Sequence, residues 1–212
     1  MHKQFTSESE KTRFETFVDA ILAIIMTILV LEFKIPEEAF DSDGHIKLHL
    51  LHQIPSFVSY FISFSTIVIL WMDHHNLFRI LKRADIPLVF LNFLFILFLS
   101  ATPFTTSLAG RNIQSSYAVA IVAANYVLMN LAFSSIWVYA MKNKMIDEIA
   151  LENMSTKREN LTILIGILLQ LASIPLAYVN TYIPFLLFIV VLIIHLILFI
   201  NRKTTSTFKY FY

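Results

Sequence analysis

The chain has 212 residues, of which 57% are hydrophobic and 15% are charged, and its formal net charge is +1. Soluble domains carry about 25% charged residues, so this composition excludes an ordinary soluble protein and favours an integral membrane protein. The absence of cysteine excludes disulfides and thiolate chemistry, and the three glycines are too few for a glycine-rich phosphate-binding loop. The near-neutral charge predicts no nucleic-acid partner.

Six apolar stretches are each long enough to cross a bilayer, whose ~30 Å core needs ~20 helical residues. They predict an all-α integral membrane protein that forms a single domain of six transmembrane helices over residues 1–212. The expected spans are approximately residues 14–33, 54–77, 86–107, 115–141, 161–178 and 183–200.

The first span has an apolar stripe with a hydroxyl near its middle. On a helical wheel, five side chains fall within about 40° of one line. They are Phe17, Ala20, Ile24, Ile28 and Leu31. Two interpretations of this stripe are open. It packs against lipid or another helix, with the nearby Thr27 bonded to the carbonyl of Ala23, or it forms the wall of a pore in a symmetric oligomer.

Asp19 lies on the same span about 140° from Ile24, so it should face a neighbouring helix rather than join the stripe. A charge at the centre of a span costs ~2.5–3.5 kcal/mol and therefore needs a partner or water. The structural interpretation gives Asp19 a buried partner, either Arg13 or a donor on the second span. The functional interpretation makes Asp19 a proton or ion site. Its direction away from the stripe favours the structural interpretation.

Residues 37–52 form the longest loop, and the later part of this loop is predicted to be a short interfacial helix. The second span then carries small hydroxyl residues three and four positions apart, a spacing that is typical of a close helix-packing seam. These residues are Ser56, Ser59, Ser63 and Thr66.

The second span ends in a polar group that contains Trp71, Asp73, His74 and His75. Neighbouring histidines point about 100° apart on a helix, unlike the i,i+4 pair of a zinc-binding helix, so we predict no metal site. We expect instead that the indole N–H of Trp71 and an imidazole donate to Asp19 across the bundle. Histidine at this place would also allow pH-sensitive transport.

Pro103 and Pro175 fall near the ends of the third and fifth spans, where they predict a kink or an early stop. Spans four to six are mainly Leu, Ile, Val and Ala and are interpreted as scaffold. With the N-terminus inside, all but three of the 16 Lys and Arg residues lie on the inner side. The exceptions are Lys34, Lys47 and Arg111. The positive-inside rule therefore predicts that both termini are cytoplasmic.

Several sequence blocks occur in an order that is typical of one family. They are RFE with the pattern Arg13, Phe17, Val18 and Asp19, the stretch from Thr27 to Pro36, Trp71 with His74 and His75, and LNFLF followed by PFTTSLAGR, which ends at Arg111. Together these blocks resemble the bacterial form of the transmembrane protein 175 potassium channels over residues 13–111. Two positions depart from the family pattern, since Val18 replaces a serine and Ala20 replaces a glycine.

The resemblance implies a six-span protomer that assembles as a homotetramer, with the first helix of each protomer lining a central pore. It assigns the pore constriction, a hydrophobic gate, to Ile24, and further pore-facing positions to Thr27, Ile28 and Leu31. It also implies a structural hydrogen-bond network that holds the helices together. The residues assigned to this network are Arg13, Asp19, Trp71, His74 and His75.

We therefore expect a homotetrameric cation channel that prefers K⁺ to Na⁺ in a bacterial plasma membrane, and no enzyme. Its partners would be the lipid bilayer and permeant K⁺ or other monovalent cations, with no cofactor. Selectivity should be modest, because it would come from dehydration at an apolar ring and from the hydroxyls of Thr27. The alternative function is a proton-coupled secondary transporter that uses Asp19 with His74 and His75 as a relay.

Overall fold

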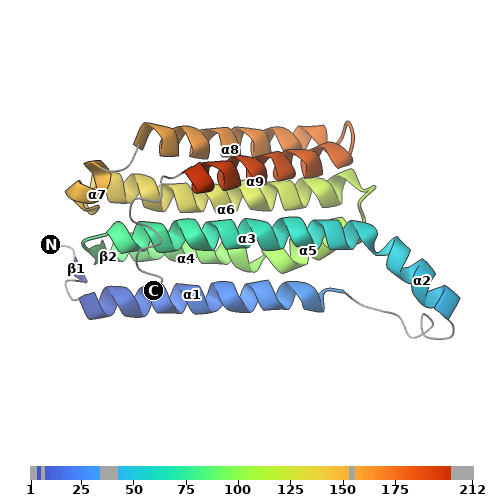
Figure 1. Ribbon diagram of the computed structural model, residues 1–212, viewed down its shortest axis with the longest axis horizontal. Coiled ribbons are helices and arrows are strands. Elements are labelled where there is room, and N and C mark those ends of the chain that lie inside the picture. The colour runs from blue at the N-terminus through green and yellow to red at the C-terminus, as the bar shows by residue number, and fades with distance from the viewer. Residues whose placement is uncertain (1–3, 6–7, 34–42, 153–155, 202–212) are drawn as a thin grey trace.

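The computed structural model describes residues 4–5, 8–33, 43–152 and 156–201. Within these ranges the chain forms long helices that run back and forth along one axis (Figure 1). The helices are α1 (Glu8–Leu31), α2 (Asp43–His52), α3 (Ile54–Ile80), α4 (Ile86–Ser100), α5 (Thr102–Arg111), α6 (Ser116–Lys142), α7 (Glu148–Glu152), α8 (Thr156–Leu176) and α9 (Tyr182–Asn201). One short antiparallel pair of strands, β1 (Gln4–Phe5) and β2 (Ala84–Asp85), departs from the predicted all-α fold.

Five segments of the described chain are long and apolar enough to cross a membrane: α1, α3, α4 together with α5, α6 and α8. The sixth predicted span is also a helix, α9, although its apolar part over Tyr182–Leu198 is shorter. In Figure 1, α1 begins and α9 ends at the same end of the bundle. This arrangement agrees with an even number of passes.

The third span is interrupted at Ala101, which separates α4 from α5. Pro103 explains the break, because it has no N–H for the carbonyl of Leu99 and its ring crowds that carbonyl. The kink predicted near Pro103 is therefore confirmed. Pro175 lies inside α8 one residue before the helix ends at Leu176, as expected for an early stop.

The helix α6 forms the centre of the bundle and packs against α4, α5 and α8. Figure 1 places α1 at one edge of the bundle and α8 at the opposite edge. The start of α4 is held to α6 by Asp85, which accepts a hydrogen bond from the backbone N–H of Leu88 at 3.0 Å and another from the Tyr139 hydroxyl at 2.8 Å. An aspartate before the first turn is a favourable N-cap because it bonds an otherwise unpaired N–H.

A buried hydroxyl seam joins α3, α5 and α6, and it consists of Ser59, Ser63, Thr106 and Tyr126. The hydroxyl of Ser63 lies 2.6 Å from the hydroxyls of Thr106 and of Tyr126, and Ser59 donates to the carbonyl of Thr106 at 3.1 Å. Close helix approach continues above the seam, where a Cβ added at Gly110 would lie 2.8 Å from the Cα of Ser56. The packing interpretation of the second-span hydroxyls is therefore confirmed.

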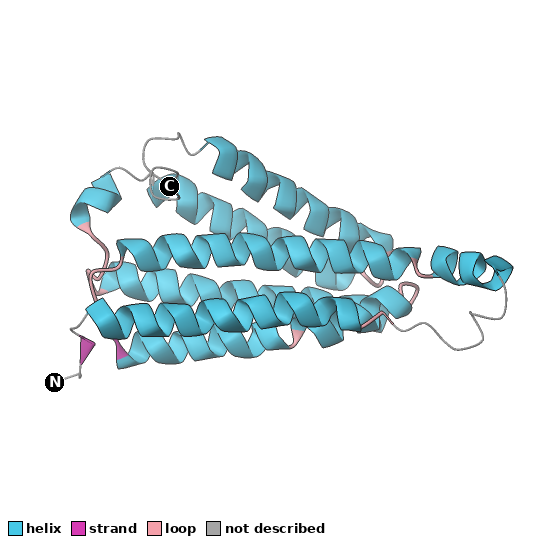
Figure 2. Cartoon of the chain, turned by 60° about the horizontal axis from the view of Figure 1, so that its bottom comes forward, coloured by secondary structure: helices cyan, strands magenta, loops and turns pink. Residues whose placement is uncertain are grey.

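The helix α2 is the short helix predicted for the later part of the long loop, and it extends from one end of the bundle (Figure 2). The earlier part of that loop, together with Lys34 and Pro36, lies outside the described residues. The same holds for the basic residues of the topology prediction at Lys3 and after Asn201.

Candidate functional site

One face of helix α1 packs into the core of the protein, and the opposite face is exposed on the surface of the single chain. The core face is at most 5% exposed and consists of Val18, Leu22, Ile25 and Leu29. The predicted stripe lies on the outer face, where Ile24 is 55% and Leu31 is 69% exposed. Phe17, Ala20, Thr27 and Ile28 are exposed as well. The whole stripe is thus available to another molecule or to lipid.

Thr27 donates its hydroxyl hydrogen to the carbonyl of Ile24 at 2.8 Å, not to that of Ala23 as the packing interpretation expected. Both carbonyls lie within reach of a helical threonine, and its χ1 rotamer selects between them. With its hydrogen engaged in the helix, the Thr27 oxygen keeps lone pairs that can accept from water or contact a cation.

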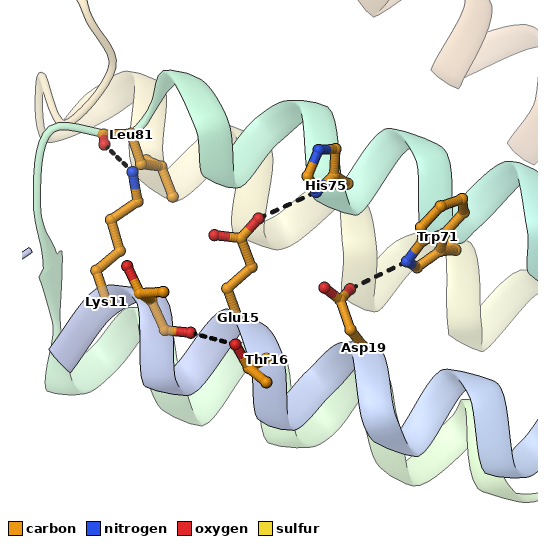
Figure 3. Close-up of polar contacts among 8 residues, drawn as sticks. Lys11, Glu15, Thr16, Asp19, Trp71, His75 and Leu81 are labelled. Atoms are coloured by element: carbon orange, nitrogen blue, oxygen red, sulfur yellow. Dashed lines mark hydrogen bonds and ion pairs between the residues drawn. The ribbon is translucent and has the colours of Figure 1, made fainter. Parts of the chain in front are cut away.

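On the side of α1 that faces α3, three polar residues spaced four apart form a ladder of contacts (Figure 3). The ammonium of Lys11 donates to the carbonyl of Leu81 at 2.6 Å. The carboxylate of Glu15 lies 3.1 Å from Nδ1 of His75. The indole N–H of Trp71 donates to Asp19 at 3.1 Å. Glu15 and Asp19 thus meet successive turns of α3, and Lys11 meets the residue that caps the end of α3.

The Trp71–Asp19 hydrogen bond is the one that the sequence predicts. Lys11 and Glu15 were not singled out, although they precede Asp19 by eight and four residues and so share its face of the helix. The spacing of four residues was the signal in the sequence that could have identified Lys11 and Glu15. A helical wheel centred on Asp19 would have found both.

The two adjacent histidines have separate environments. His74 is fully buried, its Nε2 lies 3.0 Å from the side-chain oxygen of Asn92 on α4, and its ring stacks on Phe78 with centroids 4.3 Å apart. His75 points toward α1 and Glu15. The ring nitrogens thus lie against Asn92 in His74 and against Glu15 in His75, whereas the sequence suggested a bond from an imidazole to Asp19.

The burial and the contacts of the Arg13 and Val18 side chains could not be predicted from the sequence motif alone. Arg13 is exposed, and among the described residues no hydrogen bond joins it to Asp19, Trp71 or either histidine. On the wheel it falls within about 20° of Ile24, which is the side of the stripe. Val18, at the usual serine position, is completely buried and contributes to the core.

Glu15, Asp19 and His75 form what we call the acidic–imidazole cluster. One ligand atom from each residue lies within 4.8 Å of the other two, and all three side chains are half-buried. The cluster differs from the combination of Asp73, His74 and His75, which the sequence analysis rejected as a metal site. Its members come from two helices, with Glu15 as the residue that the sequence analysis missed.

Comparisons with known proteins find relatives of this chain among channel proteins. A family model described as "Endosomal/lysosomal potassium channel TMEM175" matches residues 13–103. A protein named a potassium channel from Streptomyces collinus is 35% identical over 133 residues, which are 61% of this chain and 64% of that relative. A second one, from Chamaesiphon minutus, is 29% identical over 136 residues, which are 63% of this chain and 67% of that relative. The match therefore spans slightly less than two thirds of the first relative.

A solved structure shares the fold. The crystal structure of a lysosomal potassium-selective channel TMEM175 homologue from Chamaesiphon minutus matches with a TM-score of 0.77, covering 90% of this chain and 98% of that chain at 23% identity. The apolar helices and these relatives indicate a multi-pass membrane protein. The family model, the bacterial relatives and the shared fold all point to one family, and they confirm the resemblance of this chain to the TMEM175 channels that the sequence predicts.

Proposed function

We propose that the chain is the protomer of a homotetrameric cation channel that prefers K⁺ to Na⁺, with α1 lining a central pore and Ile24 at its constriction. The observation that carries this proposal is the exposed apolar stripe of α1, opposite the core face of the same helix. The names of the bacterial relatives favour K⁺ as the permeant ion. Conduction of this kind needs no cofactor and no covalent step.

The stripe supports a pore because its chemistry suits a dewetting gate. A ring of large apolar side chains excludes water at a narrow point, and a neighbouring ring of hydroxyls replaces part of the hydration shell of an ion. In this proposal Ile24, Ile28 and Leu31 supply the apolar rings. Thr27 supplies the hydroxyls, whose hydrogens are already bonded to the helix and whose lone pairs remain for the cation.

One chain cannot close a ring, so this mechanism requires rotational symmetry. The helix α1 lies at the edge of the bundle, where its outer face can meet the axis of a tetramer without rearrangement of the core (Figure 1). We place the assembly in a bacterial plasma membrane with both termini in the cytoplasm, because most Lys and Arg residues then lie inside. In that orientation the acidic–imidazole cluster lies at the cytoplasmic end of α1.

The direct test is to reconstitute the purified protein in liposomes and record currents under opposed K⁺ and Na⁺ gradients. A passive current whose reversal potential lies near the K⁺ potential supports the proposal. A reversal potential at the Na⁺ potential, or the absence of passive current in liposomes that contain folded tetramer, would refute it.

A proton-coupled transporter is the second candidate, and the acidic–imidazole cluster is the observation that favours it. Three titratable groups within 4.8 Å of one another offer a short proton relay. Flux that saturates with K⁺ concentration and requires a proton gradient would identify the transporter. We would then expect Asp19→Asn to abolish that flux, whereas a channel would retain passive flux.

Substitution of the constriction gives the sharpest prediction. We expect Ile24→Ala to raise liposome K⁺ flux severalfold, because a smaller side chain widens and wets the ring. The matched control is Val30→Ala. Val30 is also apolar and exposed on α1, but it lies about 120° from Ile24 on the wheel. The K⁺ flux of the Val30→Ala variant should therefore equal that of wild type. Equal flux in wild type and Ile24→Ala, both as folded tetramers, would remove Ile24 from the pore.

A further inference from the structure

The acidic–imidazole cluster has a composition that the proposed conduction path does not use. Glu15 and Asp19 lie one turn apart on the same face of α1, where like charges repel. His75 brings an imidazole nitrogen from α3 to within 3.1 Å of the Glu15 carboxylate. The pore stripe is on the other side of α1, so these groups need another role.

The distances in this cluster fit a shared metal ion. Bonds from Zn²⁺ to imidazole nitrogen and carboxylate oxygen are about 2.0–2.2 Å, which places two ligands of one tetrahedral ion about 3.3 Å apart. The pair formed by His75 Nδ1 and Glu15 Oε1, at 3.1 Å, already has this separation. Asp19 lies within 4.8 Å of both groups and reaches the same spacing by a small side-chain rotation.

Access and coordination by water are also possible at this place. The side chain of His75 is 36% exposed and that of Glu15 is 19% exposed, so water can reach the cluster, while Nδ1 of His75 itself is buried and lies against Glu15. Imidazole together with carboxylates suits divalent transition metals better than Mg²⁺ or Ca²⁺, which prefer oxygen ligands alone.

Trp71 contacts two of the proposed ligands, Asp19 and His75, without being a ligand itself. Its indole N–H donates to Oδ1 of Asp19, which leaves Oδ2 for a cation. Its ring also stacks on the imidazole of His75, with centroids 6.2 Å apart and an interplanar angle of 26°. Partners that hydrogen-bond or orient metal ligands in this way raise metal affinity. Trp71 is thus a positioning residue for two of the three ligands.

The geometry points to a divalent transition-metal site in which Glu15, Asp19 and His75 bind one ion and thereby tie α1 to α3. This inference replaces the expectation of no metal site that followed from Asp73, His74 and His75 on one helix. The two ligand sets differ because the new one combines residues from two packed helices. The site concerns α1 but is independent of which ion passes through the pore.

The test is calorimetric titration of Zn²⁺ into the purified full-length protein. His45, His49 and His52 lie on one face of α2 and offer a competing site. They are therefore changed to Gln in the background protein. We expect saturable binding that excess Mg²⁺ does not displace, together with a Zn²⁺-dependent rise in melting temperature. Glu15→Gln and His75→Gln should each weaken binding by about tenfold or more.

Two further variants separate ligation from general structural damage. Trp71→Phe keeps an aromatic ring beside His75 but loses the donor to Asp19, so Zn²⁺ affinity should fall about tenfold. His195→Gln removes a histidine on α9 whose Nδ1 lies 2.9 Å from the carbonyl of Val191, and it should leave affinity unchanged.

Two outcomes overturn the site. The first is the absence of saturable Zn²⁺ binding, or of any Zn²⁺-dependent rise in melting temperature, in the background protein. This protein carries no substitution in the cluster, so misfolding at the site cannot explain such a result. The second is unchanged Zn²⁺ affinity in folded Glu15→Gln and His75→Gln protein. Liposome currents decide the channel proposal separately, so failure of one inference does not affect the other.

Discussion

Two polar regions along α3 differ in how they satisfy their hydrogen-bonding groups inside an apolar bundle. The hydroxyl seam is neutral and buried, and its hydroxyls bond to one another or to a backbone carbonyl. The acidic–imidazole cluster is ionisable and half-buried, and it lies between α3 and the edge helix α1. Neutral hydroxyls tolerate a dry site once they are paired, whereas charged groups lose too much hydration energy there. The cluster accordingly remains near one end of the bundle.

This difference assigns different mechanical roles to the two regions. The seam joins α3, α5 and α6, which form the inner part of the protomer. The cluster joins α3 to α1, and the other face of α1 is exposed on the surface of the chain. Damage to the seam should therefore reduce the stability of the whole protomer. Damage to the cluster should loosen α1 and leave the other helices folded.

The largest effect is expected where the seam continues to Gly110. In Gly110→Ala the new Cβ would lie 2.8 Å from the Cα of Ser56, a backbone atom that cannot rotate away. Forced separation of α3 and α5 should cost about 1–3 kcal/mol of unfolding free energy. The measurement is denaturant unfolding in detergent, together with the yield of the proposed tetramer by size-exclusion chromatography.

Gly166→Ala is the matched control, because its Cβ would lie 3.6 Å from Cε1 of His195, which is an ordinary contact distance. Replacing a helical glycine there should be neutral or stabilise by about 0.5–1 kcal/mol. Equal losses in both variants would mean that helix α5 does not approach α3 as closely as described.

A smaller loss is expected from Ser63→Ala within the seam. This change removes one partner of the Tyr126 hydroxyl and one partner of the Thr106 hydroxyl, so both buried hydroxyls lose a hydrogen bond. The expected cost is about 1–2 kcal/mol. Ser100→Ala serves as the control, because Ser100 is exposed and its hydroxyl bonds to the carbonyl of Leu97 in the same helix, so the effect should stay within about 0.5 kcal/mol. Indistinguishable unfolding curves for the two variants would contradict a stabilising seam.

Features with a helical period could be predicted from the sequence. The stripe of α1, the seam on α3 and the turn of Asp19 away from the stripe all follow from 3.6 residues per turn. The kink near Pro103 follows from the missing N–H of proline. These features depend on a single helix or on one residue type.

Apart from the Trp71–Asp19 hydrogen bond, which the need of a buried carboxylate for a donor predicts, the contacts that depend on the register between two helices could not be predicted. His75 pairs with Glu15 and His74 with Asn92 because α3 packs against α1 and α4 at particular turns. No period within one segment contains that information. The predicted acceptor of the Thr27 hydroxyl was also wrong by one residue: the hydroxyl donates to the carbonyl of Ile24 and not to that of Ala23. The rotamer of a helical threonine selects between these carbonyls, and it depends on the surroundings of the side chain.

The cluster should respond more weakly than the seam. We expect Trp71→Phe and Asp19→Ala, measured in the presence of a metal chelator, each to lower the free energy of unfolding by about 1 kcal/mol through loss of the partly buried Trp71–Asp19 hydrogen bond. The double variant should lose less than the sum, because both changes break the same bond. Tetramer yield should fall while far-ultraviolet circular dichroism stays unchanged. A strictly additive double variant would show that Trp71 and Asp19 act separately.

The smallest effect is expected at an exposed carboxylate outside the spans, which provides the contrast to the cluster. Asp147 accepts hydrogen bonds from the backbone N–H groups of Ala150 and Ile149, and its Oδ2 lies 3.4 Å from the ammonium of Lys82. The Ala150 N–H, then the Ile149 N–H and Lys82, lower the pKa of Asp147 below its ordinary value of 3.8. The folded state thus favours the carboxylate.

The sign of the pH dependence follows from this lowered pKa. The stabilisation is complete above pH 3.8 and is lost as the pH falls through the lower folded-state pKa. Asp147→Asn should therefore melt slightly below wild type near neutral pH, and the two should converge in acid. Lys82→Met should have a smaller effect, because Lys82 contributes less to the shift than the backbone donors. A melting difference that persists unchanged below the folded pKa would mean that packing of the Asp147 side chain, rather than its charge, stabilises this turn.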